Sequence, residues 1–277
     1  MMLQRCLRVA LLACSALCLG GAVAAESAAP VAPVAPAKPQ LLWLTSDITT
    51  ATRTTTLQRL ANEAGWGFAQ IDYPLGGTAE LPAAQQSKLQ QALQAAAMVW
   101  VDVPHASVEA RMHKLVGPQL EAWAKPQPQR MVWINAAAQP VQDSTRWNAL
   151  SATDRMAAYL QAGGERNLRN AMQLAQAVQA KTDLPQQPVP EVLPARGIYH
   201  PDAPDLLKDA AAFDAWRVSN PKLAQRPAVA LLVHRHHFVN GSTAWLDAWL
   251  RRFEAQGLVA YAVYGQQINA QALTDLL

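Results

Sequence analysis

The sequence between Gln40 and Ala138 alternates short apolar runs with longer amphipathic stretches, and this alternation constrains the fold more than any other feature. The apolar runs have the length of strands, and the stretches between them space their apolar residues as helices do. Strands that alternate with helices of this length form βαβ units, in which a parallel sheet carries helices on both faces. The sequence therefore predicts an α/β fold, with a flavodoxin-like or binding-protein-like lobe over residues 40–145. The expected strands are Leu41–Leu44, Phe68–Tyr73, Met98–Val103 and Met131–Asn135, and the expected helices are Thr54–Ala64, Gln85–Ala97 and Val108–Trp123.

Residues 146–196 have a different character, which predicts a helical segment followed by a linker. Apolar residues recur at helical spacing from Trp147 to Thr182, with a break at Gly163-Gly164. The segment Leu184–Pro194 then holds four prolines in eleven residues. Because proline removes a backbone donor and favours extended backbone, this segment is expected to be a linker or an extended surface path.

A second α/β unit is expected in residues 197–277. Its predicted elements are a strand at Ala228–Val233, a helix at Thr243–Gln256 and a strand at Leu258–Tyr264. Two strands alone leave most of their apolar faces in water and do not form a stable sheet. Three alternatives stay open: the strands join the first sheet, a partner covers them, or the unit is incomplete because the chain is a fragment.

The first 25 residues have the pattern of a signal peptide. Arg5 and Arg8 precede an uncharged apolar run, Val9–Val23, which ends in small residues that suit a signal peptidase. A lipoprotein alternative would use Cys14, although the apolar run continues well past it. Residues 26–39 alternate Ala, Val and Pro and predict a stiff linker. We therefore expect cleavage, export and a periplasmic location, with no membrane span after the signal is removed.

Composition excludes several classes of protein. The three cysteines, Cys6, Cys14 and Cys18, all lie in the expected signal, so the mature chain would have no disulfide, thiolate metal site or cysteine nucleophile. Removal of Arg5 and Arg8 lowers the formal net charge from +3 to about +1. Such a near-neutral chain gives no electrostatic reason to expect nucleic acid as a partner.

Three stretches of the sequence resemble a known family. Tyr159–Leu168 is similar to the Gly-Gly…Asn-Leu segment of CobN and magnesium-chelatase large (H) subunits, and Gly197–Pro204 resembles the Gly-x-Tyr-His-Pro-x-Ala-Pro signature of the same family. The third stretch, Val229–Val259, resembles an apolar strand, a His-Arg-x-His turn and the helix that follows. Asn240 and Ser242 depart from the commoner family pattern, which puts in doubt any role transferred to position 242.

The resemblance implies that the chain is the N-terminal portion of such a subunit, as an exported variant. The implied ligand is a metal tetrapyrrole, such as a cobalamin precursor or haem, containing Co, Fe or Mg, and no covalently bound cofactor is expected. No Gly-x-x-x-x-Gly-Lys-Ser/Thr loop occurs in the sequence. Whether the chain is an enzyme stays open, because the chain alone is expected to lack the catalytic region.

Two alternatives to ligand handling are a non-catalytic interaction or scaffold module and the leading piece of an ATP-dependent cobaltochelatase, which forms metal–nitrogen bonds in cobalamin biosynthesis. The partners implied besides the tetrapyrrole are the remaining chelatase subunit region or an uptake system.

The best candidates for ligand contact follow the predicted strand that ends near position 234. Ligands of open parallel sheets bind beyond the carboxyl ends of strands. Imidazoles there could ligate a metal, an arginine could pair with a carboxylate, and Ser242 or Thr243 could cap the next helix. His234 and His236 would share one face if the strand continued. The predicted tetrapyrrole-binding residues are His200, His234, Arg235, His236, His237, Asn240 and Gly241, with His234 and His236 as metal ligands; no catalytic residue is assigned.

Each candidate also has a structural interpretation. The histidines after the strand could be hydrogen-bonded turn residues, and His200 could tie two lobes together by a backbone hydrogen bond. Trp245 and Trp249 are expected to pack in the core rather than to form a porphyrin platform. The solvated face of the same helix is expected to carry Arg251, Arg252 and Glu254, while His105, His113, Asp47 and Asp102 are expected to have structural or surface roles.

Overall fold

The structure is a computed structural model that describes residues 38–46, 49–73, 80–103, 106–135 and 142–265. All of these residues belong to one compact unit, Lys38–Leu277. The expected signal peptide, most of the expected linker, His105 and Asp47 lie outside the described residues. Within these ranges, no helix combines the length and the apolar character needed to cross a membrane.

The first sheet contains four parallel strands in the order β2-β1-β3-β4. This confirms the α/β fold predicted from the alternation of apolar runs and helices. The strand β3 lies inside the sheet, and all eight of its residues are buried. The strands are β1 (Gln40–Ser46), β2 (Gly67–Tyr73), β3 (Ala96–Val103) and β4 (Met131–Asn135).

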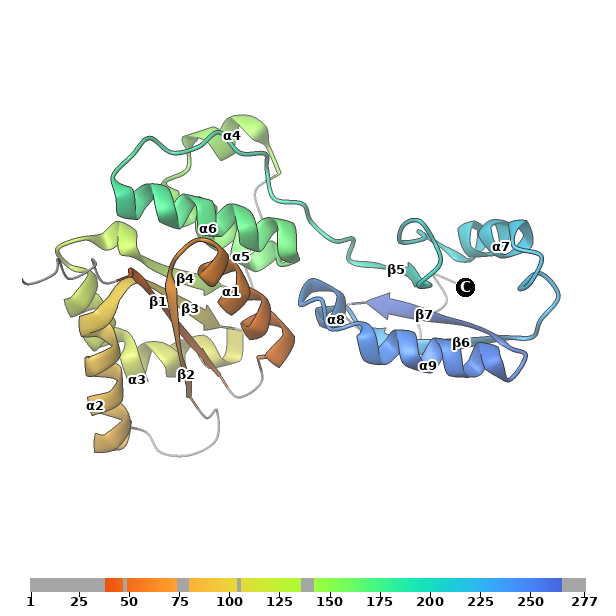
Figure 1. Ribbon diagram of the computed structural model, residues 1–277, viewed down its shortest axis with the longest axis horizontal. Helices are drawn as coiled ribbons and strands as arrows, with labels where there is room; N and C mark the ends of the chain where they lie inside the picture. Colours follow the sequence, from red (N-terminus) through yellow and green to blue (C-terminus); the bar gives the residue numbers. More distant parts are fainter. Residues whose placement is uncertain (1–37, 47–48, 74–79, 104–105, 136–141, 266–277) are drawn as a thin grey trace, which may run out of the picture. The chain divides into compact units, whose positions relative to one another are not determined.

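Helices cover both faces of this sheet because its strands alternate the direction of their side chains (Figure 1). Leu41 and Trp43 of β1 pack in a cluster with residues of α1 (Ala51–Glu63), α5 (Ala152–Ala162) and α6 (Glu165–Ala180). Leu42 and Leu44 point to the other face, where they pack with residues of α2 (Ala83–Ala95) and α3 (Ala106–Ala124). The sheet is therefore buried on both sides, as the apolar character of its strands requires.

A buried amide joins α6 to the proline-rich segment that follows it. Asn167, which is 3% exposed, donates through Nδ2 to the carbonyls of Gly163 and Glu191, both at 2.7 Å. Its Oδ1 accepts from the backbone N–H of Glu191 at 3.0 Å. One side chain thus satisfies backbone groups of two segments and fixes the path of the proline-rich stretch, which has no regular structure of its own. The remaining elements of this part are α4 (Ser144–Ala149) and the short 3-10 helix η1 (Pro128–Arg130).

The second sheet has three strands rather than the two expected from the sequence, in the order β5-β7-β6. The additional strand is β5 (Arg196–Tyr199), which pairs antiparallel to β7 (Val259–Gly265). On the other side of β7 lies β6 (Ala228–His234), which pairs parallel to it. The second pair of strands therefore does not join the first sheet. A third strand gives the unit the minimum that an independent sheet needs.

Two helices cover opposite faces of this second sheet (Figure 1). Phe213 of α7 (Ala210–Ser219) packs in one cluster with Ile198, Val259 and Val263. Leu246 and Leu250 of α9 (Ala244–Ala255) pack in another cluster with Val233, Ala260 and Ala262. A single turn of helix, α8 (His236–Val239), connects the end of β6 to the turn before α9.

We predict that Asn167→Ala lowers the free energy of unfolding by about 2–3 kcal/mol, because buried backbone groups lose their partner. Asn167→Asp keeps the shape of the side chain but removes both N–H donors, so it should be at least as destabilising. The measurement is urea denaturation followed by circular dichroism, with Gln90→Ala, a change at an exposed residue of α2, as the control. An Asn167→Ala protein as stable as the control would contradict the role of this amide.

Candidate functional site

The predicted histidines lie at the carboxyl end of β6, but they are not on one continuous strand. The strand ends at His234, and the backbone N–H of Arg235 makes a last hydrogen bond to the carbonyl of Gly265 at 2.8 Å. His236 and His237 begin the helical turn α8. The strand does not continue to His236, so the condition for the two histidines to share one strand face is not met; the turn of helix brings them together instead.

The imidazoles of this cluster (His234, His236 and His237) contact one another directly. Nδ1 of His236 lies 2.8 Å from Nδ1 of His234, and the two ring centroids are 4.8 Å apart. The ring of His237 lies 3.9 Å from that of His236. His234 and His236 are exposed, and His237 is half-buried. The rings therefore remain open to a ligand from solution.

The hydrogen bonds assign the proton positions of the exposed pair. The backbone N–H of His236 donates to Nδ1 of His234 at 3.2 Å, so this nitrogen carries a lone pair. The nearby Nδ1 of His236 must then be the donor in the contact between the two rings. In a neutral imidazole this leaves the lone pair of His236 on Nε2, which is the arrangement of a metal-binding histidine whose other nitrogen donates to a neighbour.

Two rings of the cluster, those of His236 and His237, have lowered pKa values. Partial burial, followed by the proximity of His237 and His234, lowers the pKa of His236 from 6.5 to about 4. Partial burial, followed by the proximity of His234, also lowers the pKa of His237. Both rings are therefore unprotonated near neutral pH, and an unprotonated nitrogen is what metal ligation requires.

The other predicted residues of this segment already have partners within the protein. Arg235 donates through Nε to the carbonyl of Pro194 at 3.0 Å and through Nη2 to that of Leu193 at 2.6 Å, and partial burial lowers its pKa. Oδ1 of Asn240 accepts from Nη1 of Arg53 at 3.2 Å. Arg235 and Asn240 therefore position the segment, and their contact with a ligand stays a prediction.

The start of α9 differs from the expected cap. Gly241 occupies the left-handed region with φ 65°, where a residue without a side chain is favoured. Thr243 is the N-cap residue of α9, but its side chain makes no capping hydrogen bond. The backbone N–H of Ser242 donates to the carbonyl of His237 at 2.7 Å. The side-chain cap expected at the start of α9 is therefore absent at Thr243, and the turn before this helix is held by backbone hydrogen bonds.

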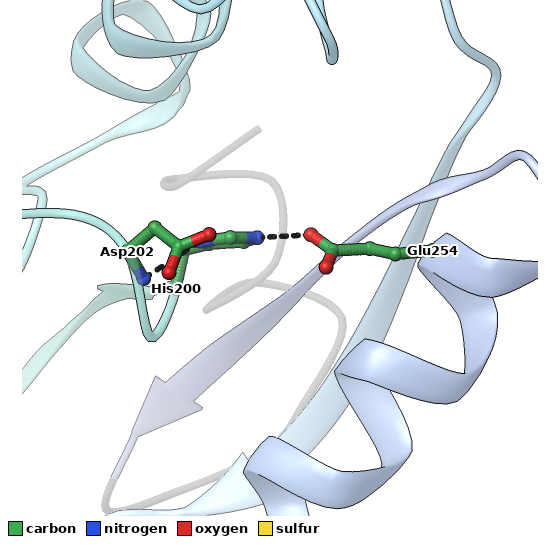
Figure 2. Close-up of side chains that lie close together, drawn as sticks. All are labelled: His200, Asp202 and Glu254. Carbon is green, nitrogen blue, oxygen red and sulfur yellow. Dashed lines mark hydrogen bonds and ion pairs between the residues drawn. The ribbon is translucent and has the colours of Figure 1, made fainter.

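His200 lies in a separate cluster together with Asp202, Arg251 and Glu254. It is 1% exposed, and its Nε2 lies 2.7 Å from Oε1 of Glu254 (Figure 2). The backbone N–H of Asp202 donates to Nδ1 of His200 at 3.1 Å. Arg251 donates to Oε2 of Glu254 at 2.8 Å and to both carboxylate oxygens of Asp202. The side chains thus connect the turn after β5 to α9.

Among the described residues, His200, Asp202 and Glu254 form the group of three whose ligand atoms lie within 4.8 Å of one another. The hydrogen bonds nevertheless disfavour a metal there. Because Nδ1 of His200 accepts an N–H, its neutral ring carries the proton on Nε2 and donates it to Glu254. Arg251 also forms ion pairs with the carboxylates of Asp202 and Glu254, so their negative charges are already balanced. This geometry favours a structural role for His200, although the bond that joins the turn after β5 to α9 is to the side chain of Glu254 rather than to backbone as expected.

The family model described as CobN/Magnesium Chelatase matches residues 157–277. The similarity to this family therefore covers less than half of the chain. This range contains the three stretches that resemble the family, the histidine cluster and the His200 cluster. The comparison with curated proteins gives no match.

A solved structure similar to this chain is the "Catalytic Subunit of Cobaltochelatase from Mycobacterium tuberculosis". The two chains share 17% identity with a TM-score of 0.46, over 87% of this chain and 17% of that chain. This chain thus spans less than a fifth of the length of that subunit.

Two features of residues 157–277 differ from the sequence expectations. Trp245 and Trp249, expected in the core, are 43% and 51% exposed. Glu254, expected on the solvated face of α9, has a side chain that is 13% exposed and contacts His200. The signals that could have located the His200 cluster were Asp202, within the second family stretch, and Arg251 and Glu254, within the third and three positions apart on one helix.

The remaining histidine and aspartate of the sequence analysis have the structural roles expected of them. His113 stacks on Trp133, with ring centroids 4.0 Å apart. Asp102 is 5% exposed, lies 3.6 Å from Nε of Arg53 and accepts from Thr49 at 3.3 Å. Both residues lie in the first α/β part, and Asp102 pairs with the same Arg53 that donates to Asn240.

We predict that His236 titrates with a midpoint near pH 4, against 6.5 for an unperturbed imidazole. Ring ¹H–¹³C correlation spectra recorded between pH 3 and 8 measure it, and His234→Ala should raise the midpoint because one nearby histidine is lost. The unfolded chain takes up a proton near pH 6.5 that the folded chain takes up only near pH 4, so this group's contribution to stability is present above pH 6.5 and declines as the pH falls. A midpoint of 6.5 in the unmodified protein would contradict the assigned geometry.

Proposed function

We propose that this chain binds a metal tetrapyrrole outside the cytoplasm and that His236 would supply a nitrogen ligand to the metal. The observation that carries the proposal is the exposed, neutral His236 ring, whose Nδ1 is held by His234 and whose Nε2 is left with a lone pair. The similarity of residues 157–277 to a family of metal–tetrapyrrole chelatases supplies the class of ligand.

His234 has a different role in this proposal from His236. Its Nδ1 accepts both the backbone N–H of His236 and the ring proton of His236, so it orients the ligating ring. Partners of this kind fix the tautomer of a metal-binding imidazole and raise its basicity. His234 is therefore a positioning residue, and its loss should weaken binding less than the loss of His236.

The chemistry of the donor favours iron or cobalt over magnesium. Imidazole nitrogen suits Fe and Co, whereas Mg²⁺ prefers carboxylate, carbonyl and water oxygens. A haem or a cobalt macrocycle is therefore the expected ligand. We propose binding rather than insertion as the activity of this chain, because the arrangement described here provides a ligand to a metal and no group assigned to metal insertion.

We predict that titration of the full chain with ferric haem shifts the Soret band saturably and that His236→Ala weakens this binding at least tenfold. His234→Ala should also weaken it, but by less than His236→Ala does, because the ligand remains and loses only its orientation. His113→Ala, at an exposed histidine of the first α/β part, is the matched control and should bind as the unmodified protein does.

Saturable haem binding that is equally strong in the unmodified protein and in His236→Ala would exclude this residue as the ligand. No saturable binding in any of the proteins would favour the non-catalytic interaction module considered from the sequence.

The proposed location outside the cytoplasm rests on residues 1–25. We predict that the chain expressed in a bacterial host is recovered from the periplasm with a new N-terminus after Ala24 or Ala25, as read by mass spectrometry. Deletion of residues 2–25 should retain the protein in the cytoplasm. An intact N-terminus on the unmodified protein in the cytoplasmic fraction would contradict export.

A further inference from the structure

The outer face of α9 carries two large aromatic side chains that the fold leaves in solvent. Trp245 and Trp249 are 43% and 51% exposed, although neighbouring Leu246 and Leu250 are fully buried against the sheet. The two tryptophans are four positions apart, so they lie one above the other on one side of the helix. Exposed indoles of this size, arranged side by side, are a feature of binding surfaces rather than of an ordinary solvated helix.

This tryptophan face (Trp245 and Trp249) is continuous with the histidine cluster. The ring of His237 contacts Trp245 edge-on at a centroid distance of 5.2 Å, and it contacts the ring of His236 in a tilted arrangement at 3.9 Å. Nδ1 of His237 is buried and has no hydrogen-bond partner within the described part of the chain. An unbroken series of rings therefore runs from the proposed metal ligand to α9.

A positive charge accompanies the tryptophan face. The guanidinium of Arg252 lies over the ring of Trp249, 6.0 Å from its centroid. Arg251, the preceding residue, is already paired with Asp202 and Glu254. Arg252 is exposed, so it can meet an anionic group of a molecule that rests on Trp249.

We propose that the tryptophan face of α9 is a binding surface on which the flat apolar face of a carboxylate-bearing macrocycle stacks. Arg252 pairs with a carboxylate at the rim of the macrocycle. This inference rests on the proposed function and extends it, because it assigns the part of the ligand that His236 does not touch. A planar aromatic ring gains from offset stacking on indole, and the gain does not require a metal.

The experiment that isolates stacking uses metal-free protoporphyrin IX, which has the ring and the carboxylates but no metal to be ligated. Binding to the full chain is followed by the absorbance and fluorescence anisotropy of the porphyrin, so that removal of tryptophan does not remove the signal. The variants are Trp245→Ala/Trp249→Ala, the same pair changed to Phe, Arg252→Ala, and Val218→Ala as a control at an exposed apolar residue of α7.

We expect Trp245→Ala/Trp249→Ala to weaken binding of the metal-free porphyrin at least tenfold and the phenylalanine pair to keep it within about threefold. Arg252→Ala should weaken porphyrin binding about threefold, and the affinity of this variant should depend less on salt concentration than that of the unmodified protein. Val218→Ala should leave binding unchanged. Because both tryptophans are exposed, circular dichroism should show that all these variants keep the fold.

The same proteins titrated with ferric haem separate this inference from the proposed function. Loss of haem binding in His236→Ala, together with equal porphyrin binding with and without the tryptophans, would contradict stacking on the tryptophan face and support His236 as the metal ligand. Porphyrin binding that depends on the tryptophans, together with haem binding that does not depend on His236, would support stacking on the tryptophan face and contradict His236 as the metal ligand. If Val218→Ala and the tryptophan changes weakened porphyrin binding equally, the binding would be non-specific adsorption, and this would contradict stacking on the tryptophan face.

Discussion

The parallel pairing of β6 with β7 is the interaction on which the histidine cluster depends. Its register runs without a shift from Ala228 opposite Val259 to His234 opposite Gly265. The bond from Arg235 to Gly265 then holds the first residue after the strand, and α8 starts directly behind it. The rings of His234 and His236 can meet only because the backbone between them is fixed at this point.

Periodicity was sufficient to predict the first sheet, because each strand of a parallel sheet is buried on both faces and is therefore a continuous apolar run. The same reasoning missed β5, which has four residues and pairs at an edge. Its apolar pattern is too short to distinguish from a turn, and its pairing with β7 joins residues far apart in sequence. Edge strands of this kind are determined by tertiary contacts that a local pattern does not contain.

The position of the candidate site could also be predicted, since ligands meet α/β sheets beyond the carboxyl ends of strands. The roles of individual residues could not. Whether Arg235 faces a ligand or the carbonyls of Leu193 and Pro194 depends on the path of a segment some forty residues earlier. The exposure of Trp245 and Trp249 depends on the rotation of α9: each tryptophan directly precedes a buried leucine, and successive residues of a helix point about 100° apart.

The ion-pair and hydrogen-bond network around His200 has a mechanical consequence for the region. It connects the turn after β5 with the last turns of α9 through a buried imidazole, two carboxylates and one guanidinium. Helix α9 therefore cannot slide or rotate about its axis without breaking charged contacts at its carboxyl-terminal end. The orientation of its aromatic outer surface is thus set by residues that never meet that surface.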